Sequence, residues 1–379
     1  MAMKELREAL HFACTVEFWR MAVLWTLSII LSYLHLFAQT FLSPNSGSYP
    51  RCSPRPVPPP GTSSSAAPAH GRPVCVITGA TSGLGAAAAD ALSREGFFVV
   101  LAGRSSHLLS KAISNIRKRN RGADLKAFEV DLSSFQSILN FKDSLQQWLL
   151  DSDMHSSIQL LINNAGILAA SGRSTAEGND MMMGTNYIAA FCLTKVLLPL
   201  LENSPAPSRI VNVTSFTHRN VFDIQVDKAT VSGKLFSKLE CYPYAHIYEY
   251  SKACLLLFSY ELHRQFVLVG KSHQVSVSAA DPGIVKTNIM REIPSCLSQV
   301  AFLVLKLLGL LQSPENGVHS ILDAALAPAG TSGVYFFGGN GRTIKSSALS
   351  YDTKLSKELW ATSCNLFFEL QLSSEETST

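Results

Sequence analysis

A tyrosine and a lysine one helical turn apart are well suited to acid–base chemistry. Tyr248 and Lys252 fall in residues 246–269, whose pattern predicts a helix, so both side chains project from one face. A free tyrosine has a pKa of about 10, and lowering it to about 7 requires roughly 4 kcal/mol of preferential stabilisation of the phenolate. A nearby ammonium in a partly dry pocket can supply this. Tyr250 is the competing proton donor, but its spacing from Lys252 points it elsewhere.

A glycine-rich turn is the second feature that could serve chemistry. Residues 74–77 predict a short buried strand, residues 78–85 read Thr-Gly-Ala-Thr-Ser-Gly-Leu-Gly, and an alanine-rich helical stretch follows to Arg94. Such an arrangement offers backbone N–H groups and a positive helix end to a pyrophosphate, although a purely structural turn has the same sequence. We therefore expect a dinucleotide crevice to which these residues contribute: Thr78, Gly79, Ser82, Gly83, Leu84 and Gly85.

An arginine after the next predicted strand bears on the choice of dinucleotide. Residues 97–102 predict that strand, and Arg104 follows it where a site that prefers NAD(H) usually has an acidic residue for the ribose 2′-hydroxyl. A guanidinium can pair with a 2′-phosphate, whereas a carboxylate would repel it. The sequence therefore favours NADP(H) over NAD(H), the alternative being a solvated surface arginine.

These residues need a scaffold that brings strand ends together. After the first two strands the chain predicts a helix over 106–121, a strand over 128–130, a helix over 134–150 and a strand over 158–162, and 334–337 reads as the last strand. Repeated strand–helix units indicate an α/β fold, a doubly wound parallel sheet with helices on both faces. Asp131 follows the third strand, where it could accept from an adenine amine or cap the next helix.

Several short motifs occur in an order that resembles a known family. These motifs are residues 78–85, Asp131-Leu132, residues 163–166 (Asn-Asn-Ala-Gly), residues 211–215 (Val-Asn-Val-Thr-Ser), residues 248–252 and residues 281–283 (Asp-Pro-Gly). Together they resemble the short-chain dehydrogenase/reductase family over residues 73–339, most of all its membrane-bound retinol and polyprenol dehydrogenases. The resemblance implies a Rossmann-type sheet and hydride transfer to or from a nicotinamide cofactor.

The same resemblance implies roles for individual residues. Tyr248 would move the proton, and Ser215 would donate a hydrogen bond to the substrate oxygen. Lys252, aided by an oxidised nicotinamide ring, would lower the pKa of Tyr248 and would also hold the nicotinamide ribose. Asn186, in a helical stretch over 184–193, matches the asparagine that orients the lysine through water. The cofactor would also be contacted by Leu132, Asn163, Ala165, Gly166, Pro282, Gly283 and Thr287.

The N-terminal region predicts a membrane attachment. After an N-terminal segment of residues 1–20, residues 21–42 carry no charged side chain and are long enough to cross a ~30 Å hydrocarbon core, although Ser28, Ser32, His35 and Gln39 interrupt the run. We expect a transmembrane or membrane-anchoring helix there, in the endoplasmic reticulum or alternatively the plastid envelope. Residues 43–72 predict a disordered Pro/Ser-rich linker, residues 73–345 the catalytic domain and residues 346–379 a tail with an amphipathic piece.

Composition limits the remaining classes. A net charge of +4 over 379 residues gives no basic surface for nucleic acid, and the eight scattered cysteines show neither metal-ligand nor disulfide spacing. Apolar segments at 289–313 and around Phe222, Val226 and Leu235 predict a wall for a lipophilic substrate. The expected protein interconverts a lipophilic alcohol and its carbonyl form, the alternative being an NADPH-binding regulatory or scaffold protein on a membrane complex. Whether it forms a homodimer stays open.

Overall fold

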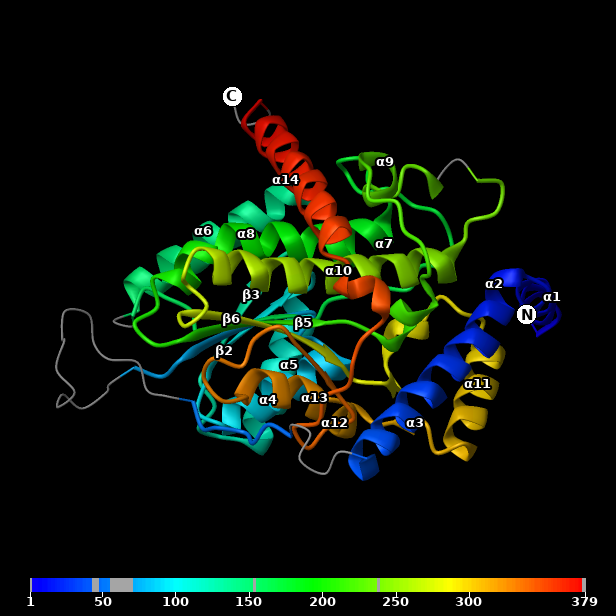
Figure 1. Cartoon of the computed structure of the whole chain (residues 1–379), viewed down its shortest axis with the longest axis horizontal. Helices are drawn as coiled ribbons and strands as arrows, with labels where there is room; N and C mark the ends of the chain where they lie inside the picture. The colour runs from blue at the N-terminus through cyan, green and yellow to red at the C-terminus, as the bar shows by residue number, and fades with distance from the viewer. Residues whose placement is uncertain (1, 43–47, 55–70, 153–154, 237–238, 377–379) are drawn as a thin grey trace.

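The computed structural model describes residues 2–42, 48–54, 71–152, 155–236 and 239–376. Its centre is a seven-stranded parallel sheet with the order β3-β2-β1-β4-β5-β6-β9 (Figure 1). The strand order reverses between β1 and β4, which opens a crevice at the carboxyl ends of those strands. The predicted doubly wound α/β sheet is therefore confirmed, with these strands: β1 (Val74–Thr78), β2 (Phe98–Gly103), β3 (Leu125–Glu129), β4 (Leu160–Asn163), β5 (Ser208–Val213), β6 (Val275–Asp281) and β9 (Val334–Phe337).

Helices cover both faces of the sheet, so its central strands are buried on both sides. Every residue of β1, β5 and β6 is buried. One face packs against α4 (Gly83–Arg94), α5 (Ser106–Arg119) and α13 (His319–Leu326), and α12 (Pro314–Gly317) lies against α4 and α13. The other face packs against α6 (Phe135–Asp151), α8 (Ala189–Glu202) and α10 (Tyr244–Leu268).

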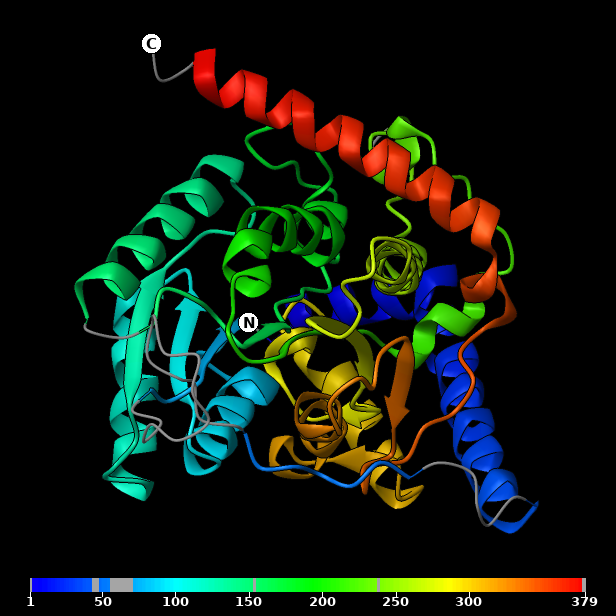
Figure 2. The ribbon, with the colours of Figure 1, turned by 60° about the vertical axis from the view of Figure 1, so that its left-hand side comes forward.

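The segment predicted as a C-terminal tail is instead part of the domain. It forms α14 (Thr353–Glu376), which lies across α10 (Figure 2). Trp360 stacks on Phe258 of α10 with ring centroids 6.1 Å apart, and Phe367 packs edge-on against Phe135 of α6 at 5.6 Å. The amphipathic pattern around 355–372 thus marks a helix that completes the core, and the domain extends well past residue 345.

The N-terminal helix lies along the catalytic domain. The chain runs through α1 (Ala2–Ala13), α2 (Val16–Trp19), the π-helical turn η1 (Arg20–Trp25) and α3 (Thr26–Leu42). Ile29 is fully buried against the domain, and the buried Ser28 donates its hydroxyl to Asn220 Oδ1 at 2.5 Å. Leu27 and Leu31 are 51% and 62% exposed on the other side. This segment is therefore not an independent tether, because one of its faces belongs to the folded domain.

Two helices in the described part of the chain are long and apolar enough to cross a membrane. Residues 181–202 have a mean hydropathy of 1.4 and are 72% buried, so they form a core helix. Residues 16–39 have a mean hydropathy of 1.8 and are 28% buried. Length and composition do not by themselves distinguish a spanning helix from a surface-lying one. The membrane role of this helix stays a prediction.

The predicted linker lies mostly outside the described residues, and its described piece differs from the expectation. Residues 48–54 dock on the domain, where Arg51 pairs with the buried carboxylate of Asp323 at 2.7 Å. The backbone N–H groups of Tyr49 and Cys52 donate to the carbonyls of Gly341 and Leu326 at 2.9 and 2.7 Å. These contacts order a stretch whose Pro- and Ser-rich surroundings had predicted disorder.

Candidate active site

A cavity of about 520 Å³ lies at the carboxyl ends of the central strands. Its size suits a small-molecule or cofactor site, and its position is the crevice expected at the reversal of strand order. The structure brings most of the predicted site residues to its wall: Gly79, Ser82, Gly83, Leu84, Gly85, Arg104, Asp131, Leu132, Ala165, Gly166, Ser215, Tyr248, Lys252, Pro282, Gly283 and Thr287. Thr78, Asn163 and Asn186 stand behind that wall.

The glycine turn has the geometry that a bound pyrophosphate requires. Gly79 and Gly83 have φ values of +65° and +55°, a region that favours glycine. A Cβ on Gly85 would lie 2.3 Å from the Gly79 carbonyl oxygen, so only glycine fits there. Ser82 precedes α4 without capping it through its side chain, which leaves the positive end of this helix directed at the cavity. The turn therefore fits a dinucleotide.

Thr78 behind the wall and Asn164 on it hold the turn in place. The Thr78 hydroxyl accepts hydrogen bonds from the backbone N–H groups of Asn164 and Ala165, each at 3.0 Å. The Asn164 side chain lines the cavity and donates to the Thr78 carbonyl at 2.8 Å. Asn163 points into the core and donates to Asn212 and Thr194. Asn164 therefore ties the ends of β1 and β4 together, a role that sequence reasoning had not given it.

The tyrosine, lysine and serine meet at one side of the cavity. Tyr248 and Lys252 both lie on α10, and the Lys252 Nζ atom is 5.7 Å from the centroid of the Tyr248 ring. The Ser215 hydroxyl, just beyond β5, hydrogen-bonds with Tyr248. Lys252 also donates to the Val213 carbonyl at 3.0 Å, which fixes the end of its side chain. Tyr250 lies outside the cavity lining, and its hydroxyl accepts from the Gln225 N–H at 3.2 Å.

Burial dominates the electrostatics of this group. It lowers the pKa of Lys252 to about 8, against which the buried carboxylate of Asp281 acts. Burial raises the pKa of Tyr248, Asp281 adds to that rise, and the hydrogen bond from Ser215 opposes it. The expected low pKa for Tyr248 is therefore not a property of the protein alone. Burial of the phenolate is the largest cause of this rise, so lowering the pKa would require a further positive charge beside the ring.

Asn186 lies close to the lysine without touching it. It sits in the π-helical turn η2 (Gly184–Ile188), and its amide oxygen accepts from the Ile167 N–H at 2.8 Å while its amide nitrogen donates to the Ile167 carbonyl at 2.9 Å. A Cβ on Gly166 would lie 3.5 Å from both Asn186 Oδ1 and Lys252 Nζ. The two groups therefore face the same small space, which the absence of a side chain at Gly166 keeps free.

The apolar part of the wall differs from the prediction. Phe222, Val226 and Leu235 do not line the cavity; Val226 is buried in the core, and Phe222 is 87% exposed. The segment after Thr287 does line it, through α11 (Ser295–Leu307) and residues such as Leu297 and Val304. The lining also includes N-terminal residues that sequence reasoning had placed outside the catalytic domain, in the N-terminal segment or the membrane helix: Phe18, Met21, Ala22, Trp25 and Thr26.

Comparison with known proteins agrees with this geometry. The sequence model described as short chain dehydrogenase matches residues 73–225. Human polyprenol dehydrogenase is 31% identical over 300 residues, covering 77% of this chain and 84% of that protein. Human retinol dehydrogenase 14 is 32% identical over 307 residues, with coverage of 77% and 84%. The NADPH-bound short chain oxidoreductase of Pseudomonas aeruginosa PAO1 aligns with a TM-score of 0.53 at 22% identity, covering 72% of this chain and 98% of that one, which shows the shared fold.

The match to relatives at this identity and coverage, the sheet order and the glycine turn all lead to one assignment. The chain belongs to the short-chain dehydrogenase family and is an oxidoreductase related to polyprenol and retinol dehydrogenases, with a fold that binds a nicotinamide dinucleotide.

Proposed function

We propose that this protein is an NADP(H)-dependent oxidoreductase that interconverts a lipophilic alcohol and its aldehyde or ketone at a membrane. The observation that carries the proposal is the gathering of Tyr248, Lys252 and Ser215 on the wall of a cavity that also contains the glycine turn. Every group that carbonyl reduction requires of the protein is therefore within one site.

The cofactor, when bound, supplies the hydride and, in its oxidised form, a positive charge near the tyrosine. Tyr248 donates its phenolic proton to the carbonyl oxygen in reduction and accepts the alcohol proton in oxidation. Ser215 donates a hydrogen bond to the same oxygen. The Lys252 ammonium stabilises the phenolate and holds the nicotinamide ribose, and Asn186 maintains the polar space beside it.

The wall chemistry supports a retinoid-, isoprenoid- or steroid-like substrate. Both α11 and the N-terminal helix contribute apolar side chains to the cavity wall, among them Leu297, Val304 and Met21. Such a wall favours a substrate with a long hydrocarbon body and one reacting oxygen. The relatives named as polyprenol and retinol dehydrogenases act on alcohols of this kind.

A substrate panel tests this function. Purified protein is given NADPH with retinal, a polyprenal, a steroid ketone and a short aldehyde, and NADPH oxidation is followed. We expect turnover with a long lipophilic carbonyl compound and a higher KM for the short aldehyde, because the apolar wall contributes binding only to the longer molecule. Tight NADPH binding without turnover of any carbonyl compound would instead favour the regulatory or scaffold protein.

Arg104 provides a prediction for cofactor choice. Its side chain is exposed, lines the cavity and follows β2 directly, which supports a contact with a 2′-phosphate. Arg104→Asp should raise the KM for NADPH about tenfold or more and improve the use of NADH, since a charge-assisted pair is replaced by repulsion. Steady-state kinetics with both cofactors measure this. Arg121→Asp, an exposed arginine outside the cavity lining, is the matched control; an unchanged NADPH preference in Arg104→Asp would refute the assignment.

Two apolar faces beside the cavity support attachment to a membrane. The N-terminal helix exposes Leu24, Leu27, Leu31, Leu34 and Phe37, and α11 with the residue after it exposes Val300, Leu303, Val304, Leu307 and Leu308. Both helices also contribute residues to the cavity wall. Large apolar side chains in such density favour a hydrocarbon environment, so a substrate dissolved in the bilayer would reach the site between these helices.

The membrane face makes a measurable prediction. Leu27→Ser and Leu31→Ser should each weaken binding to phosphatidylcholine vesicles by about tenfold, because each exposed leucine contributes about 1.5–3 kcal/mol when buried in lipid. Flotation with vesicles measures binding, and turnover of a short aldehyde should not change, since neither residue lines the cavity. Leu268→Ser, an exposed leucine at the end of α10, serves as control. Equal flotation of all three variants and the parent protein would contradict this surface.

A further inference from the structure

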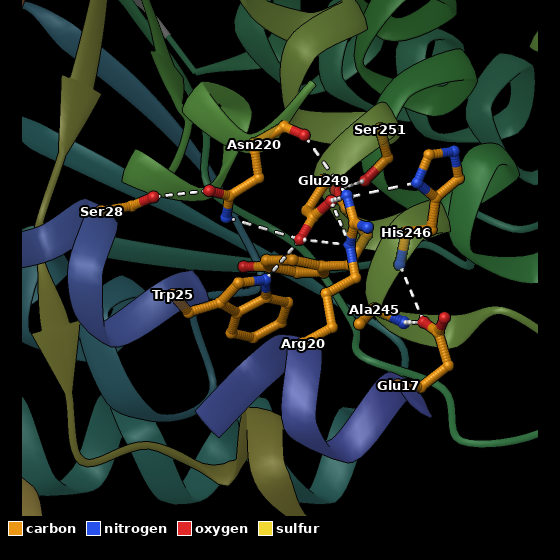
Figure 3. Close-up of polar contacts among 10 residues, drawn as sticks. Glu17, Arg20, Trp25, Ser28, Asn220, Ala245, His246, Glu249 and Ser251 are labelled. Carbon is orange, nitrogen blue, oxygen red and sulfur yellow. Dashed lines mark hydrogen bonds and ion pairs between the residues drawn. The ribbon is translucent and has the colours of Figure 1, made fainter. Parts of the chain in front are cut away.

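We propose that Glu17, Arg20 and Trp25 of the N-terminal segment are positioning residues for the helix that carries Tyr248 and Lys252. This inference rests on the proposed function of that helix, α10. Figure 3 shows the contacts, in which side chains from α2 and η1 reach the first turns of α10. The end of the predicted N-terminal segment and the start of the predicted membrane helix are thereby components of the reaction site.

Glu17 caps the catalytic helix from outside. Pro243 precedes α10 and makes no side-chain cap, so the first N–H groups of the helix need another acceptor. The Glu17 Oε2 atom accepts hydrogen bonds from the backbone N–H groups of Ala245 and His246 at 2.8 and 3.1 Å. A carboxylate at the positive end of a helix is favourable, and here it fixes where α10 begins, one turn before the tyrosine.

Arg20 and Trp25 hold the residue next to the tyrosine. The side chain of Glu249 is fully buried, and it accepts from Arg20 Nε and Nη2 at 2.8 and 2.6 Å. Trp25 donates its indole N–H to the other carboxylate oxygen at 2.6 Å. Burial raises the pKa of Glu249 and these two donors act against that rise. A buried carboxylate is stable only with such partners, so the N-terminal helix and α10 must stay in register.

Trp25 also contacts the tyrosine itself. Its ring centroid is 5.4 Å from that of Tyr248 with the planes inclined by 38°, and it lines the cavity. One side chain therefore packs on the tyrosine ring and is anchored through its N–H to the adjacent Glu249. Because proton transfer depends strongly on the placement of the phenol, a wall that restrains this ring affects the rate as well as stability.

A set of substitutions separates positioning from stability. Arg20→Met and Trp25→Leu should lower kcat about tenfold to hundredfold while the Kd for NADPH, measured by fluorescence titration, stays unchanged, because the glycine turn lies elsewhere on the wall. Arg20→Lys and Trp25→Phe should give intermediate kcat values, since each keeps one of two interactions. Arg51→Met breaks a comparable pair between a half-buried arginine and a buried carboxylate, neither of which lines the cavity. It should lower the Tm but keep kcat.

Hydrogen exchange provides a readout that needs no turnover. Amides of residues 244–252 should exchange faster in Arg20→Met than in Arg51→Met, whichever substrate the enzyme uses. If the parent protein and all variants lack turnover, the proposed function is wrong. The hydrogen-exchange result still tests the positioning role, because it does not depend on turnover. Parent-like kcat in both Arg20→Met and Trp25→Phe, or exchange of 244–252 equal to that of Arg51→Met, would overturn it. If Arg20→Met does not fold, the kcat of Trp25→Phe is the test: a reduced kcat supports the positioning role and a parent-like kcat contradicts it.

Discussion

Tyr248→Phe is expected to lower kcat for carbonyl reduction by about 10²- to 10⁴-fold, the range that general acid catalysis contributes. The substitution removes only the hydroxyl, so the ring can still pack against Trp25 and the cavity keeps its shape. The Kd for NADPH should be unchanged, because the glycine turn is untouched. Single-turnover measurements under saturating NADPH give the chemical step, and fluorescence titration gives the affinity.

Tyr250→Phe is the matched control for that experiment. Tyr250 sits on the same helix and loses the same hydroxyl, but its hydroxyl contacts the Gln225 N–H outside the cavity lining. It should keep the parent rate. A large loss in Tyr250→Phe together with parent-like turnover in Tyr248→Phe would exchange the roles of the two tyrosines and contradict the site described above.

Lys252→Met is expected to lower turnover strongly and, at the same time, to stabilise the cofactor-free protein. Turnover should fall by about 10²-fold or more, because the phenolate of Tyr248 loses the only cation within the described residues that the tyrosine ring contacts. Methionine is close in size and carries no charge, so it fits a fully buried position. The buried ammonium lowers the free energy of unfolding, and methionine removes this penalty.

The sign of the stability effect follows from the pKa of Lys252. Burial lowers this pKa from 10.5 to about 8, so between these values the unfolded chain binds more protons and stability rises with pH. The cost is complete below pH 8 and amounts to about 3 kcal/mol with the attraction of Asp281 already included, and the loss of the hydrogen bond to the Val213 carbonyl subtracts from it. Lys252→Met should therefore be the more stable protein at pH 7, with the difference shrinking towards pH 10.5 in urea unfolding. A difference that grows with pH would contradict this.

Much of the fold could be predicted because its signals are local. The apolar strands, the glycine turn and the Tyr248–Lys252 spacing each depend on a few neighbouring residues, and the structure places them together at the ends of the central strands. The strand near 128–130 begins earlier, at Leu125, because its register with Val99 of β2 and not its own composition sets the start. Element ends depend on such pairing and are harder to predict.

The parts that sequence reasoning missed depend on contacts between distant segments. Arg20 and Glu249 lie 229 positions apart, so nothing near either residue in the chain indicates the pair. The apolar run after Arg20 resembled a membrane segment, and only packing shows that one of its faces covers the catalytic domain. The amphipathic pattern near Trp360 similarly does not show which element its apolar face packs against. In the structure that element is α10, where Trp360 stacks on Phe258. Burial likewise raises the pKa of Tyr248, an effect that the spacing of Tyr248 and Lys252 in the sequence does not show.

Isotope transfer tests the central claim most directly. NADPH deuterated at C4 of the nicotinamide is incubated with the full-length protein and a polyprenal or retinal, and the alcohol is examined by mass spectrometry. Hydride transfer in this site predicts one deuterium on the carbinol carbon of the product, and none with Tyr248→Phe on the same timescale. Alcohol formed without deuterium, or tight binding of the cofactor with no labelled product from any lipophilic carbonyl compound, would contradict the account.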